Sequence, residues 1–207
     1  MRSQEFAFTR ESGGATETEF TYSQESLSKA MRTVGSIATL LSAEVASLSR
    51  FAGEVFDEFR IQKEDVSRDA VRSIRAAEAV EPIGRIHGLV EKYSTEIRDL
   101  DKAIRRYMPI AVEIVRNYPD RKTAVCGDFA AVSMFVQGIE QMSGSLRRLV
   151  ENLDTSISMS SMPEDTASAI KQMKQAVTTV REAALIATVW SREIRESPVD
   201  CTTAGEG

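Results

Sequence analysis

The feature that most constrains this chain is the spacing of its nonpolar residues, which recur in steps of three and four along most of its length. A repeat of this kind keeps one stripe of an α-helix facing a neighbouring helix. In the first helical segment the stripe consists of Leu27, Met31, Val34, Ala38, Leu41, Val45, Leu48, Ala52, Val55 and Phe59. The pattern therefore predicts an all-α protein whose helices pack side by side.

Three later segments carry the same repeat, so we expect four main helices over about 24–80, 82–118, 122–158 and 163–196. The turns between them are short, which makes consecutive helices antiparallel. Pro82 is expected to begin the second helix, and Pro109 to kink it. The expected fold is an elongated antiparallel helical bundle with a long first helix.

The nonpolar stripe of the first helix changes phase after Phe59. Its strict register would bury Asp69 and Ser73, whereas the nonpolar residues are Val66, Ala70, Ile74 and Ala77. Neither glycine nor proline occurs between Glu54 and Glu81, so we interpret the change as a four-residue stutter in one continuous helix. A break near 62–65 is the main alternative.

An unbroken first helix would reach about 85 Å, compared with about 50–55 Å for each of the others. Residues 26–44 would then have no helix of the same chain beside them, at a cost on the order of 10 kcal/mol for several exposed nonpolar side chains. Either the helix breaks and packs on its own bundle, or another chain covers this segment. We prefer self-association, through Leu27, Met31, Val34, Ile37, Leu40 and Leu41.

The chain divides into three parts by composition. Residues 1–25 are rich in Glu, Ser, Thr and Gly and carry a net charge of 2 − 5 = −3, which predicts a disordered acidic tail. Four aromatic residues in it, Phe6, Phe8, Phe20 and Tyr22, could dock onto another surface. The helical bundle is expected to span 26–196, and a second disordered tail 197–207.

Charge and targeting signals narrow the possible environments. The net charge is −5, and the basic residues are scattered, so nucleic acid is not an expected partner. No segment has the length and apolarity of a signal peptide or a membrane span. We therefore expect a soluble cytoplasmic protein without a membrane partner. Export through a disordered N-terminal signal stays open as an alternative.

The residues that could carry chemistry are few. The spacing of Cys126 and Cys201 indicates neither a disulfide framework nor a metal site, so we expect two reduced thiols. His87 is the only histidine and cannot supply the paired Glu-x-x-His elements of a dinuclear metal site. We expect no metal, no cofactor and no small-molecule substrate.

His87 leaves one enzymatic alternative, because histidine phosphotransfer domains are four-helix bundles with one exposed histidine. The stretch from Ile86 to Lys92 is only loosely similar to the motif of that family, and it lacks the usual lysine and glycine placement after the histidine. We prefer to interpret His87 as an ordinary histidine on the helix surface, although Gly84 and Gly88 leave the surface around it open.

These observations favour a non-enzymatic function. The expected protein is a helical-bundle interaction or structural module that self-associates, or pairs with another helical protein, by coiled-coil packing of the first helix. The first alternative is an exported or membrane-associating helical protein. The second is a phosphotransfer bundle that uses His87. The sequence names no pathway and no particular partner.

Overall fold

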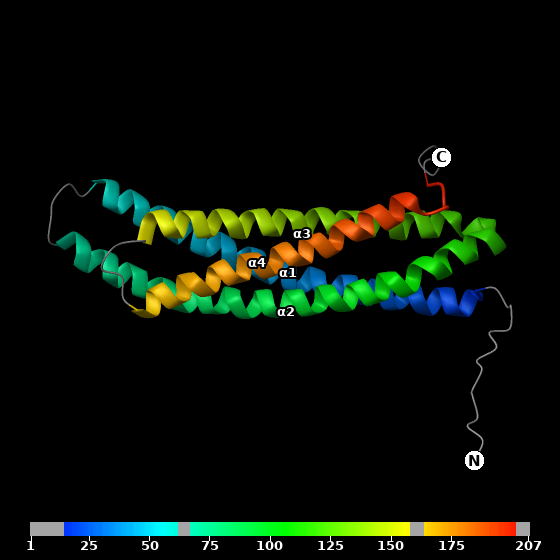
Figure 1. Cartoon of the computed structure of the whole chain (residues 1–207), viewed down its shortest axis with the longest axis horizontal. Helices are drawn as coiled ribbons and strands as arrows, with labels where there is room; N and C mark the ends of the chain where they lie inside the picture. Colours follow the sequence, from blue (N-terminus) through cyan, green and yellow to red (C-terminus); the bar gives the residue numbers. More distant parts are fainter. Residues whose placement is uncertain (1–14, 62–66, 158–163, 202–207) are drawn as a thin grey trace, which may run out of the picture.

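The computed structural model describes residues 15–61, 67–157 and 164–201, and within these ranges every regular element is a helix. The four long helices are α1 (Glu17–Ile61), α2 (Ser67–Asn117), α3 (Lys122–Ile157) and α4 (Glu164–Glu196). A short 3-10 helix, η1 (Pro119–Arg121), joins α2 to α3. Figure 1 shows an elongated bundle, which confirms the expected fold class.

The bundle consists of two helical hairpins, α1–α2 and α3–α4, laid against each other (Figure 1). α1 packs against α2 and α3, and α4 packs against the same two helices. Within the described residues α1 and α4 make no close backbone approach, so they lie on opposite corners of the bundle. The neighbours α1 and α3 consequently run parallel, as do α2 and α4.

The first helix is shorter than expected. α1 ends at Ile61 and α2 begins at Ser67, so the single helix over 24–80 is wrong and the alternative break near 62–65 is supported. The residues of the break itself lie outside the described ranges. The phase change that resembled a stutter belongs to a second helix running the opposite way, in which Ala76 and Ala79 are buried and Ile74 is exposed.

Pro82 lies inside α2 rather than at its start, which corrects the expected boundary. A proline inside a helix removes one backbone hydrogen bond. Here Ala79, Ile83 and Ile86 on either side of it are all buried in the same core, which offsets that loss. Pro109 also lies inside α2, and the C-terminal end of α2 bends toward α3 in Figure 1. This bend brings the chain across the end of the bundle to begin α3.

The N-terminal boundary also differs from the expected one, because residues 17–25 are helical and not part of a disordered tail. Thr16 and Glu19 form a capping box. The Glu19 backbone N–H donates to Thr16 Oγ1 at 3.2 Å, and the Thr16 N–H donates to Glu19 Oε2 at 2.9 Å. Phe20, in the first turns of α1, is buried. Phe6 and Phe8 lie outside the described residues.

The expected tail at the other end is corrected in part as well. Ser197 to Cys201 follow α4 in an ordered path, Val199 is buried, and Cys201 is bonded to Cys126. Residues 202–207 lie outside the described ranges.

The nonpolar stripes meet in one core that runs the length of the bundle. In α2 the three-and-four repeat predicts a stripe whose members are all buried: Ile83, Ile86, Val90, Tyr93, Ile97, Leu100, Ile104, Tyr107, Ala111 and Ile114. In α4 the repeat predicts Ile170, Met173, Val177, Val180, Ala184, Ala187 and Ile194, of which Val177, Ala184 and Ile194 are only partly buried. The buried stripe of α4 instead uses more small residues and ends in a tryptophan. It consists of Thr166, Ala169, Ile170, Met173, Ala176, Val180, Ala183, Ala187 and Trp190.

Two adjacent leucines test this burial pattern. Leu41 is fully buried, whereas Leu40 is 58% exposed. We expect Leu41→Ala to lower the free energy of unfolding by about 2–5 kcal/mol, since it leaves a cavity in the core. Leu40→Ala should change it by no more than about 0.5 kcal/mol. Urea denaturation followed by circular dichroism measures both, and equal effects would contradict the assigned facing of α1.

Candidate functional site

The six residues expected to bind a partner do not form one exposed surface. Leu27, Met31, Val34, Ile37 and Leu41 are buried against the other helices of the same chain, and only Leu40 is exposed. The premise that another chain must cover them is therefore wrong. With its break after Ile61, α1 is about 67 Å long and α2 about 76 Å, so α2 accompanies α1 over its length.

The parallel pair α1 and α3 has a fixed register. Arg121 Nη2 donates to Glu17 Oε1 at 2.6 Å, and Gln24 Nε2 donates to Asp128 Oδ2 at 2.8 Å. Both contacts join residues that are 104 positions apart in the sequence. Gln24 lies seven residues after Glu17 on α1, and Asp128 on α3 lies seven residues after Arg121, the last residue of η1, so α1 runs beside η1 and α3 in a constant alignment.

Along the middle of this pair, α1 and α3 leave a groove that is open to the surface. Its first part, of about 570 Å³, is lined by Val34, Ala38, Thr39, Ser42, Tyr93, Met134, Phe135, Gly138, Gln141, Met142 and Ser145. A second part, of about 340 Å³, continues it past Ser42, Met142 and Ser145 to Ser49 and Asn152. From residue 34 to 49 the groove follows α1 for about 22 Å, or four turns.

Small side chains produce this groove. Ala38, Ser42 and Ala46 on α1 and Gly138 and Ser145 on α3 leave little material between the two helices. A Cβ atom added at Gly138 would meet nothing within 4 Å. Met134, at the edge of the groove, is 72% exposed, whereas Met142 at its floor is buried. The groove is therefore apolar at its base and has room for inserted side chains.

The surface around the first part of the groove has almost no charge, whereas Arg148 lines the second part. Between Gly35 and Ser49 the only charged residue is Glu44, and between Phe129 and Leu146 it is Glu140. Glu44 is directed toward α2, where Arg85 Nε donates to its Oε2 at 3.3 Å. We call this surface, formed by the groove-lining residues of α1 over 38–49 and of α3 over 134–145, the α1/α3 face. Charge depletion together with exposed methionine is typical of protein interfaces.

A polar and aromatic cluster fixes the end of the bundle where α1 begins. Tyr107 on α2 donates its hydroxyl hydrogen to Asp128, which also accepts the hydrogen bond from Gln24. The Tyr107 ring lies 5.9 Å from that of Phe20 and 6.5 Å from that of Phe129, measured between centroids. This cluster ties α1, α2 and α3 together and explains why the first turns of α1 are ordered.

A second polar cluster joins α2 to α4. Trp190 Nε1 donates to Asp101 Oδ1 at 2.7 Å, and Arg105 Nε donates to Asp101 Oδ2 at 2.9 Å. Arg105 Nη1 also lies 3.7 Å from Oε1 of Glu193 on α4. The buried indole thus has its polar atom satisfied, as a fully buried tryptophan requires. The charges in this cluster pair with one another, and we assign it a structural role.

His87 lies on α2 and is partly exposed, with Nδ1 4.0 Å from Glu91 Oε1 one turn later on the same helix. Gly84 and Gly88 leave open space on either side of it. This is the ordinary environment of a histidine on a helix surface, and it gives phosphotransfer no specific support. In the described part of the chain no three His, Cys, Asp or Glu residues are grouped as metal ligands.

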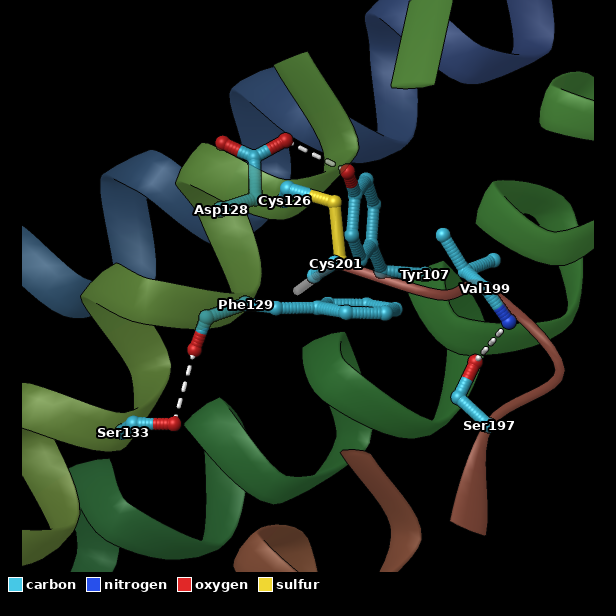
Figure 2. Close-up of a disulfide and its surroundings, with 8 residues drawn as sticks. All are labelled: Tyr107, Cys126, Asp128, Phe129, Ser133, Ser197, Val199 and Cys201. Carbon is cyan, nitrogen blue, oxygen red and sulfur yellow. Dashed lines mark hydrogen bonds between the residues drawn. A yellow bond between two sulfur atoms is a disulfide. The ribbon is translucent and has the colours of Figure 1, made fainter. Parts of the chain in front are cut away.

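The two cysteines form a disulfide, which corrects the expectation of two reduced thiols. Cys126 lies in the first turns of α3 and Cys201 lies beyond α4, and Figure 2 shows the bond together with the nearby rings of Tyr107 and Phe129. The residues are 75 positions apart, so their spacing gave no sign of the pairing. The bond depends on the return of α4 alongside α3, which only the tertiary structure shows.

Comparison with protein-family models, with curated proteins and with solved structures found no match to this chain. Among the described helices, none has the length and apolarity needed to cross a membrane. The argument for function therefore depends on the surfaces of the chain itself.

The two buried tyrosines make stability depend on alkaline pH. Burial raises the pKa of Tyr93 to about 12. Burial, followed by the hydrogen bond and the charge of Asp128, raises the pKa of Tyr107 well above its usual range. Up to about pH 10 both the folded and the unfolded chain keep these protons. Above that pH only the unfolded chain releases them, so the folded state loses stability.

We therefore expect the free energy of unfolding to fall by about 1.4 kcal/mol per pH unit for each buried tyrosine between about pH 10 and pH 12. Urea titrations at several alkaline pH values measure this slope. Tyr93→Phe should remove the contribution of one tyrosine from it. Tyr22→Phe, at a ring that is 67% exposed, is the control. Equal slopes for Tyr93→Phe and the parent protein would contradict the assignment.

Proposed function

We propose that this protein is a non-enzymatic helical interaction module that self-associates through the α1/α3 face. The observation that supports the proposal is the open groove between two parallel helices within a surface that has almost no charge. Of the six partner-binding residues expected from the sequence, the chain buries five itself, and the groove between Met134 and Ser145 takes their place. Leu40 is exposed but lies outside this face, because it is one helical turn before Glu44, which is directed toward α2.

Charge favours a second copy of the chain as the occupant of this face. The whole protein carries −5, so two copies repel each other wherever their acidic surfaces meet. Like charges are nearly absent from the α1/α3 face. A contact between two copies related by a twofold axis brings the same surface of each copy together, so that surface must not repel itself. The exposed side chain of Met134 on one copy is suited to the apolar floor of the groove on the other.

The size of the groove is consistent with helix packing between copies. Four turns of groove match the length over which helices commonly pack in a groove through residues three and four apart. The small side chains at Ala38, Ser42 and Gly138 allow close approach of a further helix. In a symmetric dimer the same face occurs on both partners, so the α1 and α3 helices of the second copy are the helices that would pack against this groove.

Two substitutions test self-association without disturbing the core. Met134→Asp places a charge at the edge of the groove, and Gly138→Arg fills the groove from a helical position where an added Cβ meets nothing. We expect each to weaken association at least about tenfold, equivalent to about 1.4 kcal/mol. Sedimentation velocity over a wide concentration range measures the association. Gly138→Arg should leave the fold intact, since replacing a helical glycine favours the helix by up to about 1 kcal/mol.

The chain offers matched controls on other faces. Leu185 on α4 is 63% exposed, similar to Met134, and α4 lies diagonally opposite α1. Gly88 on α2 has the same open surroundings as Gly138. Leu185→Asp and Gly88→Arg should associate as the parent does. A parent protein that stays monomeric at high concentration, or an equal loss in the controls, would refute the proposal.

The disulfide favours one further candidate, in which the module acts after export. Disulfides persist in oxidising compartments and are rare where glutathione and thioredoxin keep thiols reduced. The bond between Cys126 and Cys201 thus supports the alternative of an exported helical protein over the expected cytoplasmic one.

Thiol trapping in the cells that naturally make the protein tests the export proposal. A membrane-permeable alkylating reagent is added before lysis, and the intact mass of the protein is then measured. We expect both cysteines to escape alkylation, since oxidised sulfur does not react with the reagent. Two alkylated cysteines would contradict the proposal. Denaturing and reducing the sample before alkylation gives the mass of the fully modified control.

A further inference from the structure

The chain continues past the end of α4 as a short segment, Ser197–Cys201, which we call the strap. Where the strap follows α4, the Ser197 backbone N–H donates a hydrogen bond to the Ile194 carbonyl oxygen at 3.2 Å. The Val199 N–H donates to Ser197 Oγ at 3.3 Å, and the Val199 side chain is only 8% exposed. Figure 2 shows the strap ending at the bond between Cys201 and Cys126.

The strap forms one wall of an open cleft of about 880 Å³ at this end of the bundle. The opposite wall belongs to the first turns of α3, and Ile194 and Arg195 at the end of α4 complete the lining. The α3 wall consists of Thr123, Cys126, Gly127, Phe129, Ala130 and Ser133. Displacement of the strap would widen the cleft into an open surface over α3 that includes Phe129.

The noncovalent contacts of the strap are weak for a segment of this length. Val199 is its one buried side chain, and Ser197 Oγ bonds within the strap itself. Asp200 makes a polar interaction at an exposed position, where such contacts contribute little. Ordering the backbone of each residue costs conformational entropy, and the burial of one valine side chain does not offset that cost over the whole segment. The covalent bond to Cys126 is therefore the contact that keeps the strap on α3.

The four helices do not depend on the strap in the same way. Their core runs the length of the bundle, and the α1, α2 and α3 ends are joined by Tyr107, Asp128 and Gln24 without the cysteines. We propose that the Cys126–Cys201 bond is a redox-controlled latch: reduction releases the strap and uncovers the α3 surface around Phe129, while the bundle stays folded.

The chemistry of release is ordinary thiol–disulfide exchange with a dithiol reductant. A thiolate of the reductant attacks Sγ of Cys201, which is the more exposed of the two cysteines, and Cys126 leaves as a thiolate. The second thiol of the reductant then displaces Cys201. The reductant becomes a disulfide, and the two cysteines, with two electrons and two protons gained, become thiols. Reoxidation reverses the change.

Hydrogen exchange followed by mass spectrometry tests the latch on the full chain, with and without a dithiol reductant. On reduction we expect exchange of the strap amides Val199, Asp200 and Cys201 to accelerate at least about tenfold. Exchange in the α2 segment from Ile83 to Ile104 should stay unchanged, as should the helical circular dichroism signal. Carboxypeptidase should trim the reduced chain back toward Glu196 faster than the oxidised chain.

The double variant Cys126→Ser/Cys201→Ser is the matched control. It should exchange at the strap as the reduced parent does, and the reductant should change nothing in it. Two outcomes would overturn the latch. Unchanged strap exchange after complete reduction, verified by thiol titration, would show that noncovalent contacts hold it. Acceleration in α2 together with the strap would show that the bond is needed by the whole bundle.

Discussion

The rest of the structure depends on the burial of four nonpolar stripes against one another in a single core. Each stripe alone would leave a row of large side chains in water, at about 1.5–3 kcal/mol each. The chain meets this constraint by reversing after Ile61, so that α2 covers the stripe of α1 that a continuous helix would have left exposed. The same reversal places Tyr107 over Phe20 and so orders the first turns of α1.

The order of the helices around this core determines which surfaces remain. Because α1 and α4 lie at opposite corners, α3 packs beside α1 in parallel, aligned by the contacts of Arg121 with Glu17 and Asp128 with Gln24. Along that pair, alanine, serine and glycine meet where larger residues would close the gap. The groove and the low-charge surface therefore lie at the same place on the bundle. This shared position supports the proposed contact between copies.

Two sets of contacts at one end of the bundle stabilise it by different means. Hydrogen bonds and contacts between aromatic rings join α1, α2 and α3, whereas the segment after α4 depends on a covalent bond to the first turns of α3. The hydrogen-bonded cluster forms wherever the helices pack. The covalent bond forms only where the surroundings are oxidising. The same end of the molecule can therefore be closed in one environment and open in another without a change in the helical core.

The sequence by itself determined that the chain is helical, where α3 and α4 lie, and which residues of α2 face the core, because these depend on spacing along one helix. The capping box of Thr16 and Glu19 was not predicted, because residues 1–25 were expected to be a disordered tail, and its significance shows only once Phe20 is buried. Tertiary structure decided the rest. Four features depend on which helices become neighbours: the break after Ile61, the exposure of Leu40, the groove at Gly138 and the pairing of Cys126 with Cys201. Neighbour choice is set by contacts between residues distant in sequence, and a periodic pattern along one helix does not specify them.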